Sequence, residues 1–375
     1  MGGAAVWNGT VTFAGDASTP NGPVLSEHQK AYLPDSLRRP LRAAYWAAQG
    51  IARRAANRRL LRKGHAHIHV LRETEHQSNG AFYDWLARRH PDATDLFRIS
   101  AATDRSLRPA AGASLFLPWL ADPVRERDPA LFRKAAALEQ AYAERGVPIV
   151  NPVAAVSISI KSRALPRMRE AGVRAARTLL IDRATPFETI AEAVGTSFIV
   201  RNDRGHGGFM RLVHTPDDLR EVAWDQLSHP LALEFIDTRG ADDLYRKYRL
   251  LFAGSSSIPR HLIITPSWSA HAEDRMRGGS YLDEEMAFLQ SPNPFHDDLD
   301  RVRRALGLDY VAFDYSVLPD GELVVWEPNP YPVLWGRANE VNPEYDYQRP
   351  HMDAVFDLVF RFYLDRAGID HPALS

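Results

Sequence analysis

Two carboxylates and one amide interrupt a strongly apolar stretch near the carboxyl end of the chain, VAFDYSVLPDGELVVWEPN. The Pro-Asp-Gly sequence at 319–321 is typical of a turn, so the segments on either side predict two antiparallel strands. Glu327 and Asn329 are two residues apart and therefore share one face of an extended strand. Asp314 precedes the turn by about as many residues as Glu327 follows it, so strand pairing can bring the two carboxylates side by side.

These three oxygen donors have two interpretations. In the first they form a metal site, because two carboxylates and an amide suit Mg²⁺, which keeps positions for phosphate oxygens. In the second the acids lie on a solvated surface hairpin. The flanking residues are apolar, which indicates burial and favours the metal site. The apolar flanking residues are Val311, Phe313, Val324, Val325 and Trp326.

A second candidate binding segment, FIVRNDRGHGG, combines a cation with glycines. Arg201 ends a predicted strand, and Gly205, His206, Gly207 and Gly208 follow it. Glycines let backbone N–H groups approach phosphate oxygens closely, and a nearby cation neutralises the charge. The pattern is weak alone, since glycine-rich hairpins are common. It is neither a Walker motif, which ends in Gly-Lys-Ser/Thr, nor a dinucleotide-binding fingerprint that opens a helix.

Composition limits the remaining chemistry. The 375 residues contain no cysteine, which excludes disulfides, thiolate metal sites and a cysteine nucleophile. Lysine and arginine together number 46 against 47 acidic residues, so no strong field covers the whole molecule. No apolar run has transmembrane length and the N-terminus does not resemble a signal peptide, so we expect a cytoplasmic protein without a transmembrane segment.

Residues 36–63 depart from this even balance, with nine basic residues and no acidic one. Apolar residues recur at helical spacing through the same segment, which predicts a basic amphipathic helix, or two with a break at Gly50. One interpretation is a docking surface for an anionic macromolecular partner. The other is the solvated face of a helix that packs on the core.

Hydrophobic periodicity divides the chain into four parts. Residues 1–63 are an N-terminal extension that contains the basic helix. Residues 64–152 alternate predicted strands and helices, which is typical of a small doubly wound α/β domain. Residues 153–232, with the glycine-rich loop, and 233–375, with the hairpin and a C-terminal helix, are typical of α+β structure.

Ligands of α/β sheets bind beyond the carboxyl ends of the strands. The loop after the first predicted strand therefore supplies Glu73, Glu75, His76 and Asn79 as candidate substrate-binding residues. Alternatively these residues only cap the helix that follows. PIVNP at 148–152 predicts another short strand of the same sheet.

Taken in chain order, these segments resemble the ATP-grasp superfamily, in particular its carboxylate–amine ligases such as D-alanine–D-alanine ligase and the ribosomal-protein glutamate ligases. The most specific element is the hairpin, with Asp314 and Glu327 thirteen positions apart and a Glu-x-Asn ending. The resemblance, from about Pro148 to Gly368, implies a Rossmann-like pre-ATP-grasp domain before a two-part ATP-grasp domain. It also implies ATP, two Mg²⁺ ions (Mn²⁺ being the alternative), and a frequent homodimer.

The resemblance assigns a role to each matching position. The positions that it assigns to the metal are Asp314, Glu327 and Asn329, those for the phosphates are Lys161, Arg201 and the loop 203–208, those for the adenine are Glu234, Phe235 and Ile236, and those for the ribose are Asp237 or Asp243. Arg249 is similar to the basic residue near the γ-phosphate. The implied reaction activates a carboxylate as an acyl phosphate and joins it to an amine.

One departure from the family concerns Ala312, where some relatives carry an arginine that steadies the tetrahedral intermediate. Arg249, Arg260 and Arg337 are the candidate replacements, and the alternative for each is an ordinary surface ion pair. Two other functions are open: a kinase that phosphorylates a hydroxyl, and a non-catalytic ATP-binding regulator. A complete metal trio argues against the regulator, which does not need a second cation.

Overall fold

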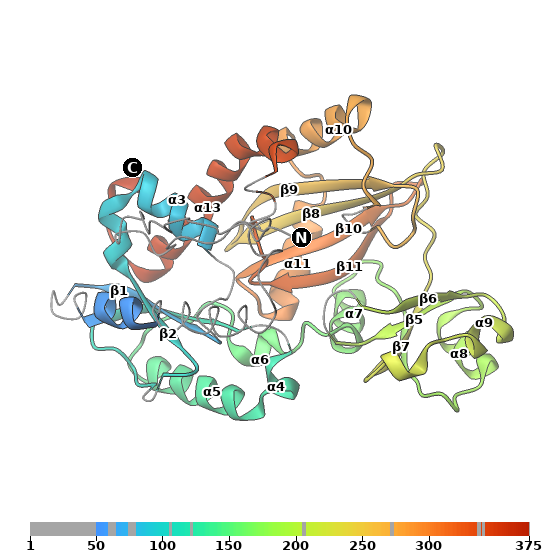
Figure 1. Cartoon of the computed structure of the whole chain (residues 1–375), viewed down its shortest axis with the longest axis horizontal. Helices are drawn as coiled ribbons and strands as arrows, with labels where there is room; N and C mark the ends of the chain where they lie inside the picture. The colour runs from blue at the N-terminus through green and yellow to red at the C-terminus, as the bar shows by residue number, and fades with distance from the viewer. Residues whose placement is uncertain are drawn as a thin grey trace, which may run out of the picture.

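A computed structural model shows three sheets side by side, with the sheet of β8–β11 between the other two (Figure 1). The residues that the structure describes are 50–58, 65–73, 80–104, 107–120, 123–204, 208–270, 274–335, 339 and 342–374.

The bounds of the elements follow in chain order. The strands are β1 (His67–Arg72), β2 (Phe97–Ala101), β3 (Ala113–Trp119), β4 (Thr178–Leu180), β5 (Phe198–Asn202), β6 (Met210–Val213), β7 (Pro230–Glu234), β8 (Tyr245–Ala253), β9 (Ser256–Thr265), β10 (Tyr310–Val317) and β11 (Leu323–Pro330). The α-helices are α3 (Gly80–Arg89), α4 (Val124–Arg127), α5 (Pro129–Ala143), α6 (Val153–Val156), α7 (Lys161–Glu170), α8 (Phe187–Val194), α9 (Pro216–Arg220), α10 (Gly279–Gln290), α11 (His296–Leu306) and α13 (Arg349–Ala367). The 3₁₀ helices are η1 (Pro91–Leu96), η2 (Trp224–Gln226), η4 (Pro343–Gln348) and η5 (Pro372–Leu374).

The first sheet is parallel, in the order β2-β1-β3, with helices on both faces. Alternate residues of β1 point to opposite faces: Ile68 and Val70 belong to the core that includes α3, and Leu71 to the core that includes α5. Together with the two antiparallel sheets described below, this parallel sheet confirms the predicted combination of α/β and α+β structure. The strand predicted at 148–152 is wrong in extent, since only a single parallel bridge joins Ile149 to Phe116. Prolines at both ends lack an N–H for a ladder, and Asn151 has a left-handed φ of 53°.

Residues 50–58 are helical, and part of their charge is used inside the molecule. Arg53 is buried and donates to both carboxylate oxygens of Asp104 and to the carbonyl of Ile99. The Asn57 side chain exchanges two hydrogen bonds with the backbone of Ile99, and so occupies part of the free edge of β2. The contacts of Arg53 therefore agree with the second interpretation of the basic segment, a helix that packs on the core. Residues 36–49 and 59–63 lie outside the described residues.

The second sheet is antiparallel, in the order β4-β7-β5-β6, and has its own small core with α8 and α9. The third sheet is antiparallel in the order β11-β10-β8-β9. Two of its helices, α10 and α11, were not predicted from the sequence. Helix α7 contacts α11 and β11, so residues 161–170 lie beside the hairpin of β10 and β11.

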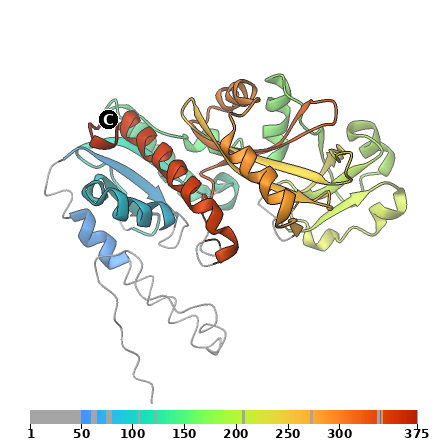
Figure 2. The ribbon, with the colours of Figure 1, turned by 90° about the horizontal axis from the view of Figure 1, so that it is seen from above.

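Helix α13 joins the first sheet to the third (Figure 2). It contacts β1, β3 and α3 on one side and β8 and β9 on the other. Its aromatic side chains meet those of α3 and β2, as in the ring contacts Phe356–Phe82 and Phe360–Trp85. These contacts make one continuous hydrophobic core across the two sheets. Among the described residues no helix is both long and apolar enough to span a membrane.

Asn151 fixes the start of β10 to the end of the first sheet. Its side-chain oxygen accepts from the N–H groups of Asp309 and Tyr310, at 2.8 and 2.9 Å, and its amide donates to the Tyr310 carbonyl. The side chain is fully buried. A second bond runs nearby, from the Tyr331 hydroxyl to the Val150 carbonyl at 2.6 Å.

We expect Asn151→Ala to lower the free energy of unfolding by about 2–4 kcal/mol, because three buried backbone groups lose their partner and a left-handed φ is strained for alanine. Urea denaturation measures this change. Asn151→Gly separates the two causes, since glycine removes the hydrogen bonds and tolerates the φ. Equal stability of the alanine variant and the wild type would contradict the assignment.

Glu139 makes stability depend on pH at the same junction. Its carboxylate accepts from the Val153 N–H at the start of α6, and burial raises its pKa from 4.5 to about 7. Between these two pH values the unfolded chain has lost the proton and the folded chain keeps it, so this group's contribution falls as pH rises and stays low above pH 7.

We expect Glu139→Gln, which keeps an acceptor for Val153, to stabilise the protein by about 1–3 kcal/mol above pH 7 and by almost nothing near pH 4.5. Urea unfolding of both proteins across this range measures the difference. Glu144→Gln removes an exposed carboxylate just beyond the same helix and is the control for charge. Parallel stability profiles for Glu139→Gln and the wild type would show that the carboxylate has no such effect.

Candidate functional site

Four polar side chains form a row across the third sheet. Arg249 on β8 is in register with Asp314 on β10, and Asp314 is in register with Glu327 on β11. On the other side of Arg249, His261 on β9 is its register partner. Residues directly opposite each other on neighbouring strands share a face, so the register alone brings these side chains together.

A β-bulge in β11 is what places Glu327 in this row. From the turn inward, Val317 pairs with Leu323 and Tyr315 with Val325, but Asp314 pairs with Glu327. Trp326 is therefore the extra residue, and without it Glu327 would project from the opposite face. Bulges are frequent beside functional sites because they redirect a side chain.

Each carboxylate of the row has a cation at hydrogen-bond distance. Arg249 binds Asp314 through two bonds, Nε to Oδ1 at 2.5 Å and a terminal nitrogen to Oδ2 at 2.7 Å. Lys161 donates to Glu327 Oε2 at 2.8 Å. Asp314 is 2% exposed and Lys161 6%. Charges this deeply buried require partners, and Asp314 accordingly raises the pKa of Arg249 against the lowering effect of burial.

The amino end of α7 holds Lys161 in place. Ser162 donates to Asp203 twice, through its backbone N–H at 2.8 Å and its hydroxyl at 2.6 Å. Asp203 is buried and follows β5 directly. The first residue of the predicted phosphate loop is thus an anchor between the second sheet and the helix that carries Lys161.

Several buried polar atoms near the row have no hydrogen-bond partner among the described residues. These atoms are Nε of Arg201, Nε of Arg204, Nδ2 of Asn329 and Nε2 of His261. Glu327 and Asp203 raise the pKa of Arg201, but burial, the larger effect, lowers it overall. Burial and the charges of Arg249 and Arg260 hold the pKa of His261 well below its ordinary value. Unsatisfied buried donors are rare in native proteins, so they indicate positions that a ligand completes.

The donor set fits a hard divalent cation. Asp314 and Glu327 are adjacent, and Asn329, two residues from Glu327 on the same strand, is 7% exposed. Two carboxylates and an amide are the oxygen ligands that Mg²⁺ accepts, and the neighbouring cations suit phosphate. This set contains only two carboxylates, and the third donor is an amide. Within the described part of the chain, no group made of three or more His, Asp or Glu side chains is arranged so that it could hold a metal ion.

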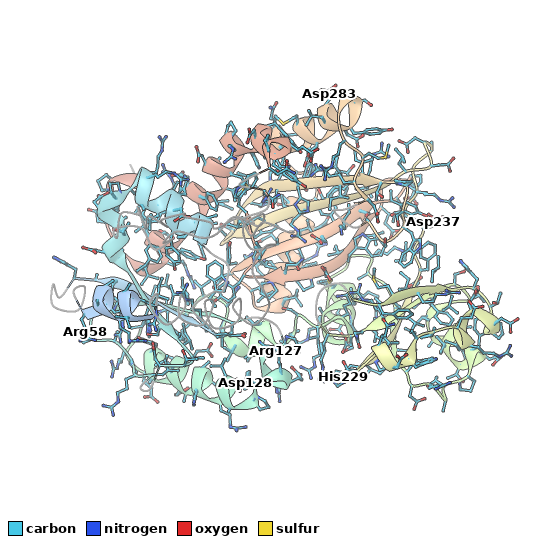
Figure 3. All side chains as sticks on the ribbon, viewed as in Figure 1. Arg58, Arg127, Asp128, His229, Asp237 and Asp283 are labelled. Atoms are coloured by element: carbon cyan, nitrogen blue, oxygen red, sulfur yellow. The ribbon has the colours of Figure 1, made fainter. Side chains whose placement is uncertain are left out.

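The predicted hinge residues lie on and after β7. Glu234 accepts from the backbone and side chain of Arg177, at 3.0 and 3.2 Å. The Phe235 N–H donates to the Ser197 carbonyl, so a base would have to use other groups of this segment. Asp237 is bound by Arg239 and lies between the second and third sheets (Figure 3). Asp243 has a left-handed φ of 60° in the exposed turn that follows.

Arg260, a predicted candidate for catalysis, is buried and does not form the surface ion pair that was its alternative. Its guanidinium donates to the carbonyl of Leu334 and the side-chain oxygen of Gln348, and stacks over Trp335. Burial and Arg249 lower its pKa to about 10. Arg260 therefore holds the segment after the hairpin, and a catalytic role for it remains a prediction.

The other predicted residues are only partly described. Glu73 forms an ion pair with Arg127 at 2.5 Å, on α4 at the lower edge of the molecule (Figure 3). Gly208 has a left-handed φ of 82°. The remaining predicted residues, which lie outside the described residues, are Glu75, His76, Asn79, Gly205, His206, Gly207 and Arg337.

Sequence reasoning missed three residues of the site and the role of a fourth. Ser162 and Arg177 bind predicted residues, and His261 extends the row. Asp203 was predicted only as part of the loop 203–208, and its role as the anchor of α7 was not. A histidine inside the apolar strand HLIIT was the one available signal, since Asp203 and Ser162 act through contacts between distant segments.

Neither a protein-family model nor a curated protein sequence matches the chain. Solved structures do resemble it. The ATP-grasp ligase PsnB, complexed with a phosphomimetic variant of its minimal precursor, Mg and ADP, superposes with a TM-score of 0.51 at 16% identity, over 80% of this chain and 99% of that one. D-alanyl-alanine synthetase A from Vibrio cholerae superposes with a TM-score of 0.50 at 10% identity, over 81% and 99%. The chain has the fold of the ATP-grasp superfamily.

Proposed function

We propose that the protein is an ATP-dependent ligase that joins a carboxylate to an amine. The observation that carries this proposal is the buried row of alternating charges, in which Lys161 and Arg249 meet Glu327 and Asp314. The PsnB structure, which contains Mg, ADP and a variant of that protein's minimal precursor, supports ATP and Mg²⁺ as ligands.

Each group of the row has a part in binding. Asp314, Glu327 and Asn329 would hold Mg²⁺, which would neutralise part of the charge of the phosphates. Lys161, Arg201 and Arg249 then bind the phosphates and stabilise the charge that develops on the transferred group. The segment from Glu234 to Asp243, which begins at the end of β7, is our candidate for the adenosine.

The reaction has two steps. An oxygen of the substrate carboxylate attacks the γ-phosphorus, the bond to the β,γ-bridging oxygen breaks, and ADP leaves. The amine nitrogen then attacks the carbonyl carbon of the acyl phosphate, phosphate leaves with its bonding pair, and the nitrogen gives up a proton. Such an intermediate hydrolyses readily, so the site must exclude water. The loop 203–208 is our candidate cover.

We expect ADP release from ATP to require both an acid and an amine. A screen over acid–amine pairs, with short peptides among the acids, measures ADP, and mass spectrometry identifies a product that has lost one water relative to the pair. ADP release that needs a hydroxyl compound and no amine would instead indicate a kinase. ATP binding without turnover of any acceptor would indicate a regulator.

Asp314→Asn should lower ADP release about 100-fold or more, because it removes a metal ligand and the anionic partner of Arg249 together. Asp320→Asn, in the exposed turn of the same hairpin, is the matched control and should keep the wild-type rate. Circular dichroism checks that both variants are folded. Equal rates for the two variants would exclude Asp314 from the machinery.

A further inference from the structure

The two carboxylates and the two cations of the row balance one another in charge. Asp314 and Glu327 carry one negative charge each, and Arg249 and Lys161 supply one positive charge each at 2.5–2.8 Å. The side chains of Asp314 and Lys161 are 3% and 8% exposed, so solvent screens these pairs little. Arg249 and Lys161 therefore neutralise the two carboxylates, as a bound divalent ion would.

A metal ion that arrived alone would meet two obstacles. Arg249 binds both oxygens of Asp314, so a metal ion would have to share this carboxylate with a guanidinium or displace it from two charge-assisted hydrogen bonds. In either case the guanidinium, and the ammonium of Lys161, would lie buried beside a divalent cation that repels both.

A nucleotide that arrived alone meets the opposite obstacle. Its phosphates attract Lys161 and Arg249, and the negative phosphates then lie close to the two negative carboxylates, which repel them. Arg201, whose Nε is buried without a hydrogen-bond partner, offers the phosphates one donor that requires no such exchange. Only when both ligands are present does every charge have a partner.

We propose that Arg249 and Lys161 exchange partners on ligand binding: they release Asp314 and Glu327 to the metal as they bind the phosphates, and this exchange suppresses metal binding to the nucleotide-free protein. The proposal rests on the proposed function, because it takes the row to be the site of a nucleotide and its metal. It assigns to the two cations a function before ligands bind, in addition to their contacts with phosphate.

Binding of Mn²⁺ to the nucleotide-free protein, measured from the electron paramagnetic resonance signal of the free ion, tests the exchange. We expect weak binding by the wild type and binding at least about tenfold tighter by Arg249→Gln, because Asp314 is then released without a buried cation beside the metal. Lys161→Gln, which removes the buried ammonium beside Glu327, should act in the same direction. The double variant Arg249→Gln with Asp314→Asn should lose the gain.

Arg246→Gln is the matched control. Arg246 lies on the same strand and pairs with Asp242 and Glu284, so its removal should leave Mn²⁺ affinity at the wild-type value. Should Arg249→Gln and Lys161→Gln, folded by circular dichroism, both bind Mn²⁺ no more tightly than the wild type, the exchange is wrong.

Failure of the proposed function gives a different result. A wild-type protein that binds no ADP in the presence of Mn²⁺ or Mg²⁺, by calorimetry, contradicts the nucleotide site itself. Normal binding of ADP with Mn²⁺, together with unchanged Mn²⁺ affinity in both single variants, contradicts the exchange and leaves the ligase proposal standing.

Discussion

The two ion pairs Arg249–Asp314 and Lys161–Glu327 hold together three parts of the chain that are distant in sequence. A buried carboxylate without a partner is strongly destabilising, so the hairpin of β10 and β11 can be buried only where β8 and α7 supply cations. The same requirement positions α7, whose first turn is tied to the second sheet through Ser162 and Asp203. The ion pairs that form the site therefore also determine how α7, β8 and the hairpin pack together.

This arrangement also explains why the site lies in a dry part of the molecule. The strands that carry the row are apolar on either side of it, with Phe313, Val324 and Val325 fully buried or nearly so. Electrostatic interactions are stronger in such surroundings than in water, which increases both the attraction within a pair and the cost of a lone charge. A ligand that brings its own balanced charges, as a nucleotide with its metal does, suits such a site.

The sequence predicted most of the regular elements because their hydrophobic periods are strong, and it predicted that Asp314 and Glu327 would lie together because they are nearly equidistant from a recognisable turn. It could not predict the bulge at Trp326, since nothing in the local pattern distinguishes an extra residue from a register shift. It also missed the partners of Arg260, because Leu334 and Gln348 lie more than 70 residues away along the chain. Helices α10 and α11 were not predicted. The segment 148–152 was predicted as a strand but forms a single β-bridge, because its prolines and Asn151 cannot continue a ladder.

The open end of the hairpin is fixed to the first sheet from both of its strands. Asn151 binds the start of β10 through three hydrogen bonds, and Tyr331, directly after β11, binds Val150. Adjacent residues of one connecting segment therefore set the position of both strands that carry the donor set. Since helix α13 packs against β1 and β3 as well as β8 and β9, the first sheet and the sheet that carries the row of charges share one continuous core. The position of the charged row relative to the first sheet is thus set by packing and by the hydrogen bonds of Asn151 and Tyr331, and such rigid support is what a preorganised site requires.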